Sequence, residues 1–124
     1  MGEDTNQPYT FEHAVAANLL SVLANPIRLA ILRRITVEEW DVNALSKDLG
    51  ISQSALSQHL GKLREAELVT TRRSAQQIIY SSGSFAVLSV LATLTELGLE
   101  PCKPSMDARR EVAGRARKTR VAVS

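Results

Sequence analysis

The chain has 124 residues, of which 44% are hydrophobic and 23% are charged, and its formal net charge is +2. This size and composition are typical of one soluble globular domain with a modest core. A single cysteine excludes an intrachain disulfide framework and favours a reducing compartment. The acidic N-terminus does not resemble a signal peptide, and the apolar stretch 85–99 is too short for a membrane span. We therefore expect a cytoplasmic protein without a membrane partner.

The charge is unevenly distributed along the chain. Residues 103–124 carry seven basic and two acidic side chains, so residues 1–102 have a net charge of −3. The positive net charge therefore says nothing by itself about the surface of a folded domain. We predict three segments: a flexible N-terminus at 1–10, a folded domain at 11–98 and a basic C-terminal tail at 99–124. The tail is either solvated or a nonspecific grip on phosphates.

Hydrophobic periodicity and helix-stop signals predict four helices in the first half of the chain. The first two lie at 11–23 and 26–37 and are separated by Asn25-Pro26. After a short extended link at 40–42, Asn43 is predicted to cap a helix at 44–49 that ends at Gly50. Ser52 then caps a longer helix that runs through residue 64.

The second half of the chain predicts a hairpin and one more helix. The strands lie at 68–73 and 76–81, with Ser74-Ala75 as the tight turn between them. A last helix runs from 84 to about 97. The order α-α-α-α-β-β-α is mainly α with a small β-hairpin, and a short helix, a turn and a longer helix form a helix-turn-helix. We predict a winged helix-turn-helix fold.

The helix that begins after Ser52 has two contrasting faces. Each residue advances about 100 degrees, so Leu56, Leu60 and Leu63 cluster on one side. The opposite face carries short polar and basic side chains, and no acidic residue interrupts it before Glu65: Gln53, Ser54, Ser57, Gln58 and Lys62. Amides and hydroxyls form hydrogen bonds with base edges and phosphates, and Gln pairs bidentately with adenine. This face predicts contact with a DNA major groove, against the alternative of an ordinary solvated helix face.

Four other residues are candidate DNA contacts, each with a structural alternative. His59, on the flank of the same helix, either contacts a phosphate or is partly buried and hydrogen-bonded inside the helix-turn-helix. Arg72, Arg73 and Gln76 flank the tip of the hairpin and either contact DNA or are solvated. Neighbouring side chains of a strand point to opposite faces, so we expect only one of the two arginines to face DNA at a time.

Gly61 lies on the polar face of the same helix. It either lets the helix approach the DNA backbone closely or is a tolerated defect that costs about 1 kcal/mol.

Two helices lack the charges that a fully solvated surface needs. Residues 14–27 contain no charged side chain, and none lies between Arg73 and Glu96. A monomer of this size cannot cover such apolar helices on every side. We therefore expect a homodimer through the first and last helices, which also suits the reading of a palindromic DNA site.

The order of elements, together with the segments Asn25-Pro26-Ile27-Arg28-Leu29 and 52–60 (SQSALSQHL), resembles the ArsR/SmtB family of winged-helix repressors. The resemblance covers residues 11–98. It implies a DNA-binding transcriptional repressor that acts as a homodimer on a pseudo-palindromic operator in double-stranded DNA.

Many members of that family sense metals, and the resemblance allows their ligand positions to be compared. The positions of a Cys-Val-Cys element correspond to Asp41-Val42-Asn43, which offer no thiolate. The positions at the last helix correspond to Ser84, Phe85, Ala86, Leu97 and Glu100, and one carboxylate does not make a zinc site. We predict no metal and no cofactor.

Two other readings remain open from the sequence. Redox members of the family use two cysteines, and Cys102 matches only the second position. A redox- or persulfide-responsive repressor switched through Cys102, for example by a disulfide between subunits, is therefore the alternative, beside an incidental thiol. A protein-interaction module that has lost DNA binding is a third reading. The chain has no phosphate loop, no activated nucleophile and no carboxylate pair that would indicate an enzyme.

Overall fold

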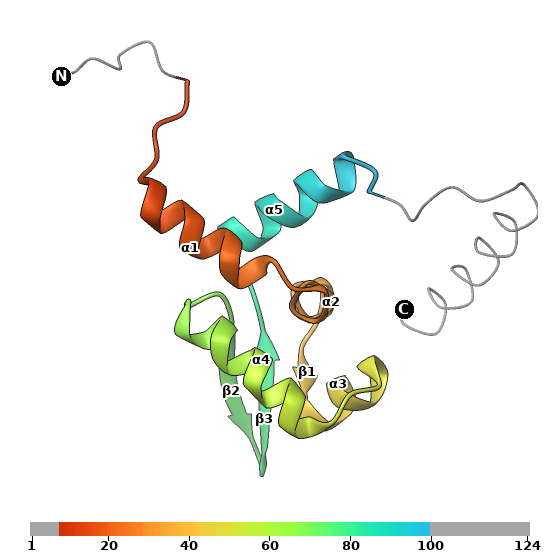
Figure 1. Cartoon of the computed structure of the whole chain (residues 1–124). Coiled ribbons are helices and arrows are strands. Elements are labelled where there is room, and N and C mark those ends of the chain that lie inside the picture. The colour runs from red at the N-terminus through yellow and green to blue at the C-terminus, as the bar shows by residue number, and fades with distance from the viewer. Residues whose placement is uncertain (1–7, 100–124) are drawn as a thin grey trace, which may run out of the picture. The chain divides into compact units, whose positions relative to one another are not determined.

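The computed structural model describes residues 8–99 (Figure 1). Within this range the elements are α1 (His13–Leu23), α2 (Pro26–Ile35), β1 (Trp40–Asp41), α3 (Val42–Leu49), α4 (Gln53–Glu65), β2 (Thr70–Ser74), β3 (Gln77–Ser81) and α5 (Phe85–Glu96). The chain divides into two compact units between Val87 and Leu88, inside α5. Residues 1–7 of the predicted N-terminal segment, and all of the predicted tail beyond Leu99, lie outside the described residues.

Local signals in the sequence explain where the helices of the first unit begin and end. The Asn25 side chain accepts hydrogen bonds from the backbone N–H groups of Ile27 and Arg28, and Pro26 occupies the first turn of α2. Helix α3 ends at Gly50, whose φ of +70° is the left-handed conformation that glycine adopts without strain. The Ser52 hydroxyl accepts a hydrogen bond from the N–H of Ala55 at 3.1 Å and starts α4, as predicted.

A compact apolar core holds the helix-turn-helix in place. The three leucines predicted for the inner face of α4 are all buried, and so are Ile31, Leu32 and Ile35 of α2 and Leu45 of α3. The sheet and its flanks add further buried side chains: Leu68, Val69 and Tyr80. The residues just before β2 and Tyr80 near the end of β3 join this core, whereas the tip of the hairpin projects beyond it (Figure 1). The predicted winged-helix class is confirmed.

The sheet has one strand more than the sequence predicts. Instead of forming part of a simple link, Trp40 and Asp41 pair antiparallel with Tyr80 and Ile79, which gives a three-stranded sheet in the order β1-β3-β2. A two-residue strand has no periodicity, so no sequence pattern indicates it. The hairpin turn also differs from the prediction. Ser74 pairs with Gln77, so the turn residues are Ala75 and Gln76, and Ala75 has a φ of +58°.

The start of α3 also differs from the prediction. Helix α3 begins at Val42, and its N-cap is Asp41, whose carboxylate accepts a hydrogen bond from the N–H of Ala44 at 2.8 Å. Asn43, predicted to be the cap, lies in the first turn of the helix with its side chain exposed. Asp and Asn are both good N-cap residues. Here the extended strand β1 ends at Asp41, so the helix starts there.

No single helix among residues 8–99 is long and apolar enough to cross a membrane. Helices α1 and α2 pass that test of length and composition only when taken together, and the chain bends by 87° between them.

Candidate nucleic-acid interface

The outer face of α4 is fully available to a ligand. The five side chains predicted to contact DNA are all exposed: Gln53, Ser54, Ser57, Gln58 and Lys62. Helix α4 has no acidic residue in its first turn, and Lys62 and Arg64 lie in its last turn. The N-terminal end of a helix also carries a partial positive charge. The face thus combines neutral hydrogen-bonding groups with positive potential, which suits the edges and phosphates of a duplex.

Gly61 lies on this same face. A Cβ atom placed on Gly61 meets no other part of the described protein within 4 Å. Packing within the chain therefore does not require glycine at this position.

His59 is half-buried on the flank of α4. Its Nδ1 atom accepts a hydrogen bond from Nε of Arg28 at 3.3 Å, and Nη1 of Arg28 also donates to the carbonyl oxygen of Val22 at 3.0 Å. Arg28 thus connects the end of α1 to α4. Because Nδ1 accepts, a neutral imidazole carries its proton on Nε2, and that atom is left to donate to another group. The hydrogen bond is made to α2, not inside the helix-turn-helix as the structural alternative proposed.

An ion pair joins α2 to the first helix of the helix-turn-helix. Nε of Arg34 donates to Oδ2 of Asp48 at 2.6 Å, and Nη1 of Arg34 donates to the carbonyl oxygen of Ala30 at 2.8 Å. Both side chains are largely covered, with 16% and 25% of their surface exposed. The pair therefore fixes α3, and through the turn at Gly50 also α4, against α2.

The two helices of the helix-turn-helix are also connected at their exposed edge. Nε2 of Gln53 donates a hydrogen bond to Oδ1 of Asn43 at 3.0 Å. Both residues lie in the first turn of their helices, α4 and α3 respectively.

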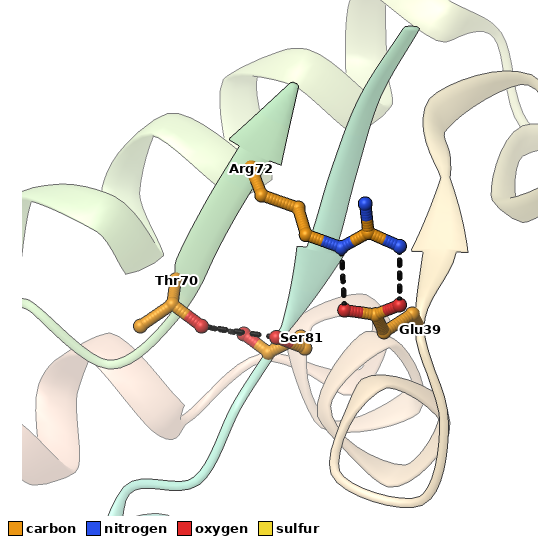
Figure 2. A network of polar contacts seen from close by, with 4 residues as sticks. All are labelled: Glu39, Thr70, Arg72 and Ser81. Carbon is orange, nitrogen blue, oxygen red and sulfur yellow. Dashed lines mark hydrogen bonds and ion pairs between the residues drawn. The ribbon is translucent and has the colours of Figure 1, made fainter. Parts of the chain in front are cut away.

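Arg72 on the wing is already paired with an acidic side chain (Figure 2). Its Nε and Nη2 atoms donate to the two carboxylate oxygens of Glu39 at 2.9 and 2.7 Å. The hydrogen bonds from Arg72 and its positive charge lower the pKa of the Glu39 carboxyl group, so the carboxylate stays ionised. Arg72 reaches across β3 to the residue before β1, and Thr70 bonds to Ser81 beside it. In this state the charge of Arg72 is neutralised.

Arg73 belongs to the opposite face of the sheet. It pairs with Ile78, whereas Arg72 pairs with Ile79, and directly paired residues of neighbouring strands share a face. Tyr80 and its partner Trp40 share the face of Arg73. Arg73 is exposed, and no ion pair between described residues involves it. Gln76, in the turn, is exposed as well. The predicted separation of the two arginines onto opposite faces is confirmed.

Glu39, Arg28 and Asn43 were not predicted as partners of the site. Each acts through a contact between residues distant in sequence, 33, 31 and 10 positions apart. In the sequence, an acidic residue at position 39 is only a weak indication of an ion pair with an arginine of the wing. The pairing of β1 with β3 brings Glu39 close to Arg72, and that strand is itself not visible in the sequence.

The residues at the positions compared with the Cys-Val-Cys metal site, 41–43, are not placed to bind a metal in this chain. Asp41 uses its carboxylate to cap α3, and Val42 and Asn43 offer no thiolate or imidazole. Among residues 8–99, no group of three or more His, Cys, Asp or Glu side chains is placed to hold a metal ion. Cys102 and Glu100 lie outside the described residues, so the redox alternative stays a prediction.

Both terminal helices of the folded region expose apolar side chains. On α1, Val15 and Leu20 are 68% and 58% exposed. On α5, Phe85 and Leu88 are 84% and 44% exposed. Only Leu23 is buried among the residues of α1, and only Val87 among those of α5.

These features define a class: a winged helix-turn-helix protein in which the second helix of the motif, α4, exposes a polar and basic face without an acidic residue before Glu65, and in which the wing carries arginines. Comparison with known proteins agrees. Residues 23–72 match the model of a helix-turn-helix domain family. The chain is 52% identical over 99 residues to the nodulation protein NolR of Rhizobium meliloti, a match that covers 77% of this chain and 81% of that protein. It is 44% identical over 84 residues to the transcriptional activator HlyU of Vibrio cholerae, covering 68% and 78%.

Solved structures show the same fold. The crystal structure of NolR from Sinorhizobium fredii superposes with a TM-score of 0.68 at 50% identity and covers 73% of this chain and 95% of that one. The transcriptional repressor BigR from Xylella fastidiosa superposes with a TM-score of 0.66 at 32% identity and covers 82% and 99%. The chain belongs to the ArsR/SmtB family of winged-helix transcriptional regulators, among which it is similar to NolR. The members are DNA-binding regulators and not enzymes.

Proposed function

We propose that this protein is a transcriptional repressor that binds a pseudo-palindromic operator as a homodimer, without a bound metal. The observation that carries the proposal is the outer face of α4, where five exposed polar or basic side chains follow one another without an acidic residue. The N-terminal residues of a recognition helix contact base edges in the major groove. We therefore assign base contacts to Gln53, Ser54, Ser57 and Gln58, and a phosphate contact to Lys62.

His59 and the wing supply further contacts in this proposal. His59 donates from Nε2 to a phosphate while Arg28 holds its ring through Nδ1. Arg73 and Gln76 contact the backbone or the minor groove beside the wing. Arg72 contributes only after its bond to Glu39 is broken, because a paired guanidinium releases no counterion from DNA.

Exposed apolar side chains on α1 and, separately, on α5 support the dimer. Large exposed apolar patches on a folded protein mark interaction surfaces. A second copy of the chain is the occupant that fits, because an isologous interface buries the same apolar helices on both subunits. Such a dimer carries two α4 helices, and a spacing of roughly 34–36 Å between them, one turn of the duplex, is what the two halves of an operator require.

The assignment of base reading is tested with two variants of α4. We expect Gln53→Ala to weaken binding to a selected operator by about 1–3 kcal/mol and to leave binding to scrambled DNA unchanged, so that specificity falls. Lys62→Ala should instead weaken both duplexes alike and lower the salt dependence. If Gln53→Ala binds both duplexes as the parent does, Gln53 does not read a base.

The dimer is tested with a matched pair of surface substitutions. Leu20→Asp places a charge on the exposed apolar side of α1, and Val37→Asp places the same charge at a side chain that is 80% exposed beyond the end of α2. We expect Leu20→Asp to give monomers in analytical ultracentrifugation and to lose affinity for the operator, whereas Val37→Asp stays dimeric. A monomeric parent protein, or a dimeric Leu20→Asp variant, contradicts the proposed interface.

A further inference from the structure

The hydrogen bond between Asn43 and Gln53 lies at the point where a base-reading side chain leaves α4. Nε2 of Gln53 donates to Oδ1 of Asn43 at 3.0 Å, and both side chains are exposed. Gln53 is the first residue of α4, the end of a recognition helix that enters the groove. Asn43 therefore contacts one of the two polar groups of this side chain that would also face a base.

The Asn43 side chain does not cap α3, and its described hydrogen bond is the one that connects α3 to Gln53. The cap of α3 is Asp41, whose carboxylate bonds to the N–H of Ala44. Asn43 lies one residue inside the helix, where asparagine is less favourable than alanine. It is exposed, so its amide contributes nothing to the core. The contact with Gln53 is the hydrogen bond that its side chain makes in the described part of the chain.

The remaining hydrogen-bonding capacity of Gln53 is that required for adenine. A glutamine amide has two N–H donors on Nε2 and one carbonyl acceptor, Oε1. One N–H is occupied by Asn43, so the second N–H and Oε1 remain available for other partners. Adenine offers an acceptor at N7 and a donor at N6 in the major groove, and a glutamine amide matches both. The contact with Asn43 thus restrains the amide and leaves it one donor and one acceptor for a base.

We propose that Asn43 is a specificity-determining positioning residue that holds the Gln53 amide in its base-reading orientation before DNA binds. This inference rests on the proposed role of Gln53. A long flexible side chain loses conformational freedom when it binds, and a contact that restricts it beforehand reduces that loss. Asn43 therefore raises affinity for the base pair that Gln53 prefers and leaves affinity for other base pairs at that position nearly unchanged.

The test measures discrimination at a single base pair. The full chain is first incubated with a library of random duplexes, and the bound duplexes are sequenced to locate the base pair whose preference Gln53→Ala abolishes. Two duplexes that differ only at that pair are then titrated. We expect Asn43→Ala to reduce the ratio of the two affinities by about threefold to tenfold, through weaker binding of the preferred duplex alone.

Two further variants separate positioning from direct contact. Asn43→Asp keeps the acceptor oxygen, so it should retain the parent ratio while its added negative charge weakens binding to both duplexes alike. In the Gln53→Ala background, Asn43→Ala should cause no further loss of discrimination. Thermal unfolding should show that Asn43→Ala stays folded with a melting temperature close to that of the parent, because the loss of an exposed hydrogen bond is offset by the better helix propensity of alanine.

The outcomes distinguish the inference from the function on which it rests. If Gln53→Ala abolishes a base preference but Asn43→Ala leaves the ratio unchanged, the inference is wrong and the proposed function stands. If the losses caused by Asn43→Ala and Gln53→Ala add in the double variant, Asn43 contacts DNA by itself, and the positioning role is refuted. If Gln53→Ala changes no base preference, the base-reading role of Gln53 and the inference both fall.

Discussion

Arg73 and Arg72 are adjacent in β2, yet the structure predicts different contributions to DNA binding. Arg72 is neutralised by Glu39 through two hydrogen bonds, whereas no ion pair between described residues involves Arg73. Each phosphate neutralised by a free cation adds about 0.9 to the slope of log K against log salt concentration. Arg73→Ala should therefore lower the magnitude of that slope by about 0.9 per subunit.

The matched control removes the ion pair as a unit. The double variant Glu39→Ala/Arg72→Ala has the parent net charge, so its slope should equal that of the parent. Between 50 and 200 mM salt, a slope change of 0.9 corresponds to roughly a threefold difference in relative affinity for each subunit. Fluorescence anisotropy with a labelled operator over this salt range measures the affinity at each salt concentration and therefore the slope. Equal slopes for the parent and Arg73→Ala, or a reduced slope for the double variant, would refute the division of roles between the two arginines.

Three further changes give predictions that follow from local geometry. Gly61→Ala should stabilise the fold by about 1 kcal/mol in chemical denaturation, because the added methyl group meets open space. The same methyl group should weaken DNA binding by keeping the helix backbone away from the DNA. Unchanged affinity would show that the backbone does not approach DNA there. Ala75→Gly should stabilise the fold by about 0.5–1 kcal/mol by removing the strain of a positive φ, and a loss of stability in thermal unfolding would contradict this. Arg72 lowers the pKa of the Glu39 carboxyl group below its ordinary value of 4.5, so the parent should be more stable than Glu39→Gln at neutral pH. This difference in stability should vanish as the pH falls through the lowered pKa and the carboxylate is protonated. A difference that persists in acid would exclude the ion pair as its cause.

The sequence predicted the helices of this fold well because their signals are local. The leucine spacing of α4, the cap at Ser52 and the stop at Gly50 each depend on residues within one or two turns of one another. The short strand β1 depends instead on pairing with β3, about forty residues later, and two residues carry no period. The incorrect cap of α3 has the same origin, since the end of β1 determines that Asp41 begins the helix.

The candidate site divides in the same way. Helical periodicity alone placed the exposed residues of α4 on one face, and strand alternation separated Arg72 from Arg73. The hydrogen-bond and ion-pair partners of these residues could not be predicted, because each partner comes from a different element. Arg28 reaches His59, Glu39 neutralises Arg72, and these contacts exist only once α2 and β1 are packed. The state of a binding residue, paired or free, is a property of the fold.

The central claim is that two copies of α4 read a duplex together. The most direct measurement is selection of bound sites from random duplexes by the full chain, followed by sequencing. We expect enrichment of two inverted half-sites whose centres lie about one helical turn apart, and loss of a defined base preference within each half-site for Gln53→Ala. Enrichment of a single unpaired half-site, or no sequence enrichment at a salt concentration where binding is measurable, would contradict it.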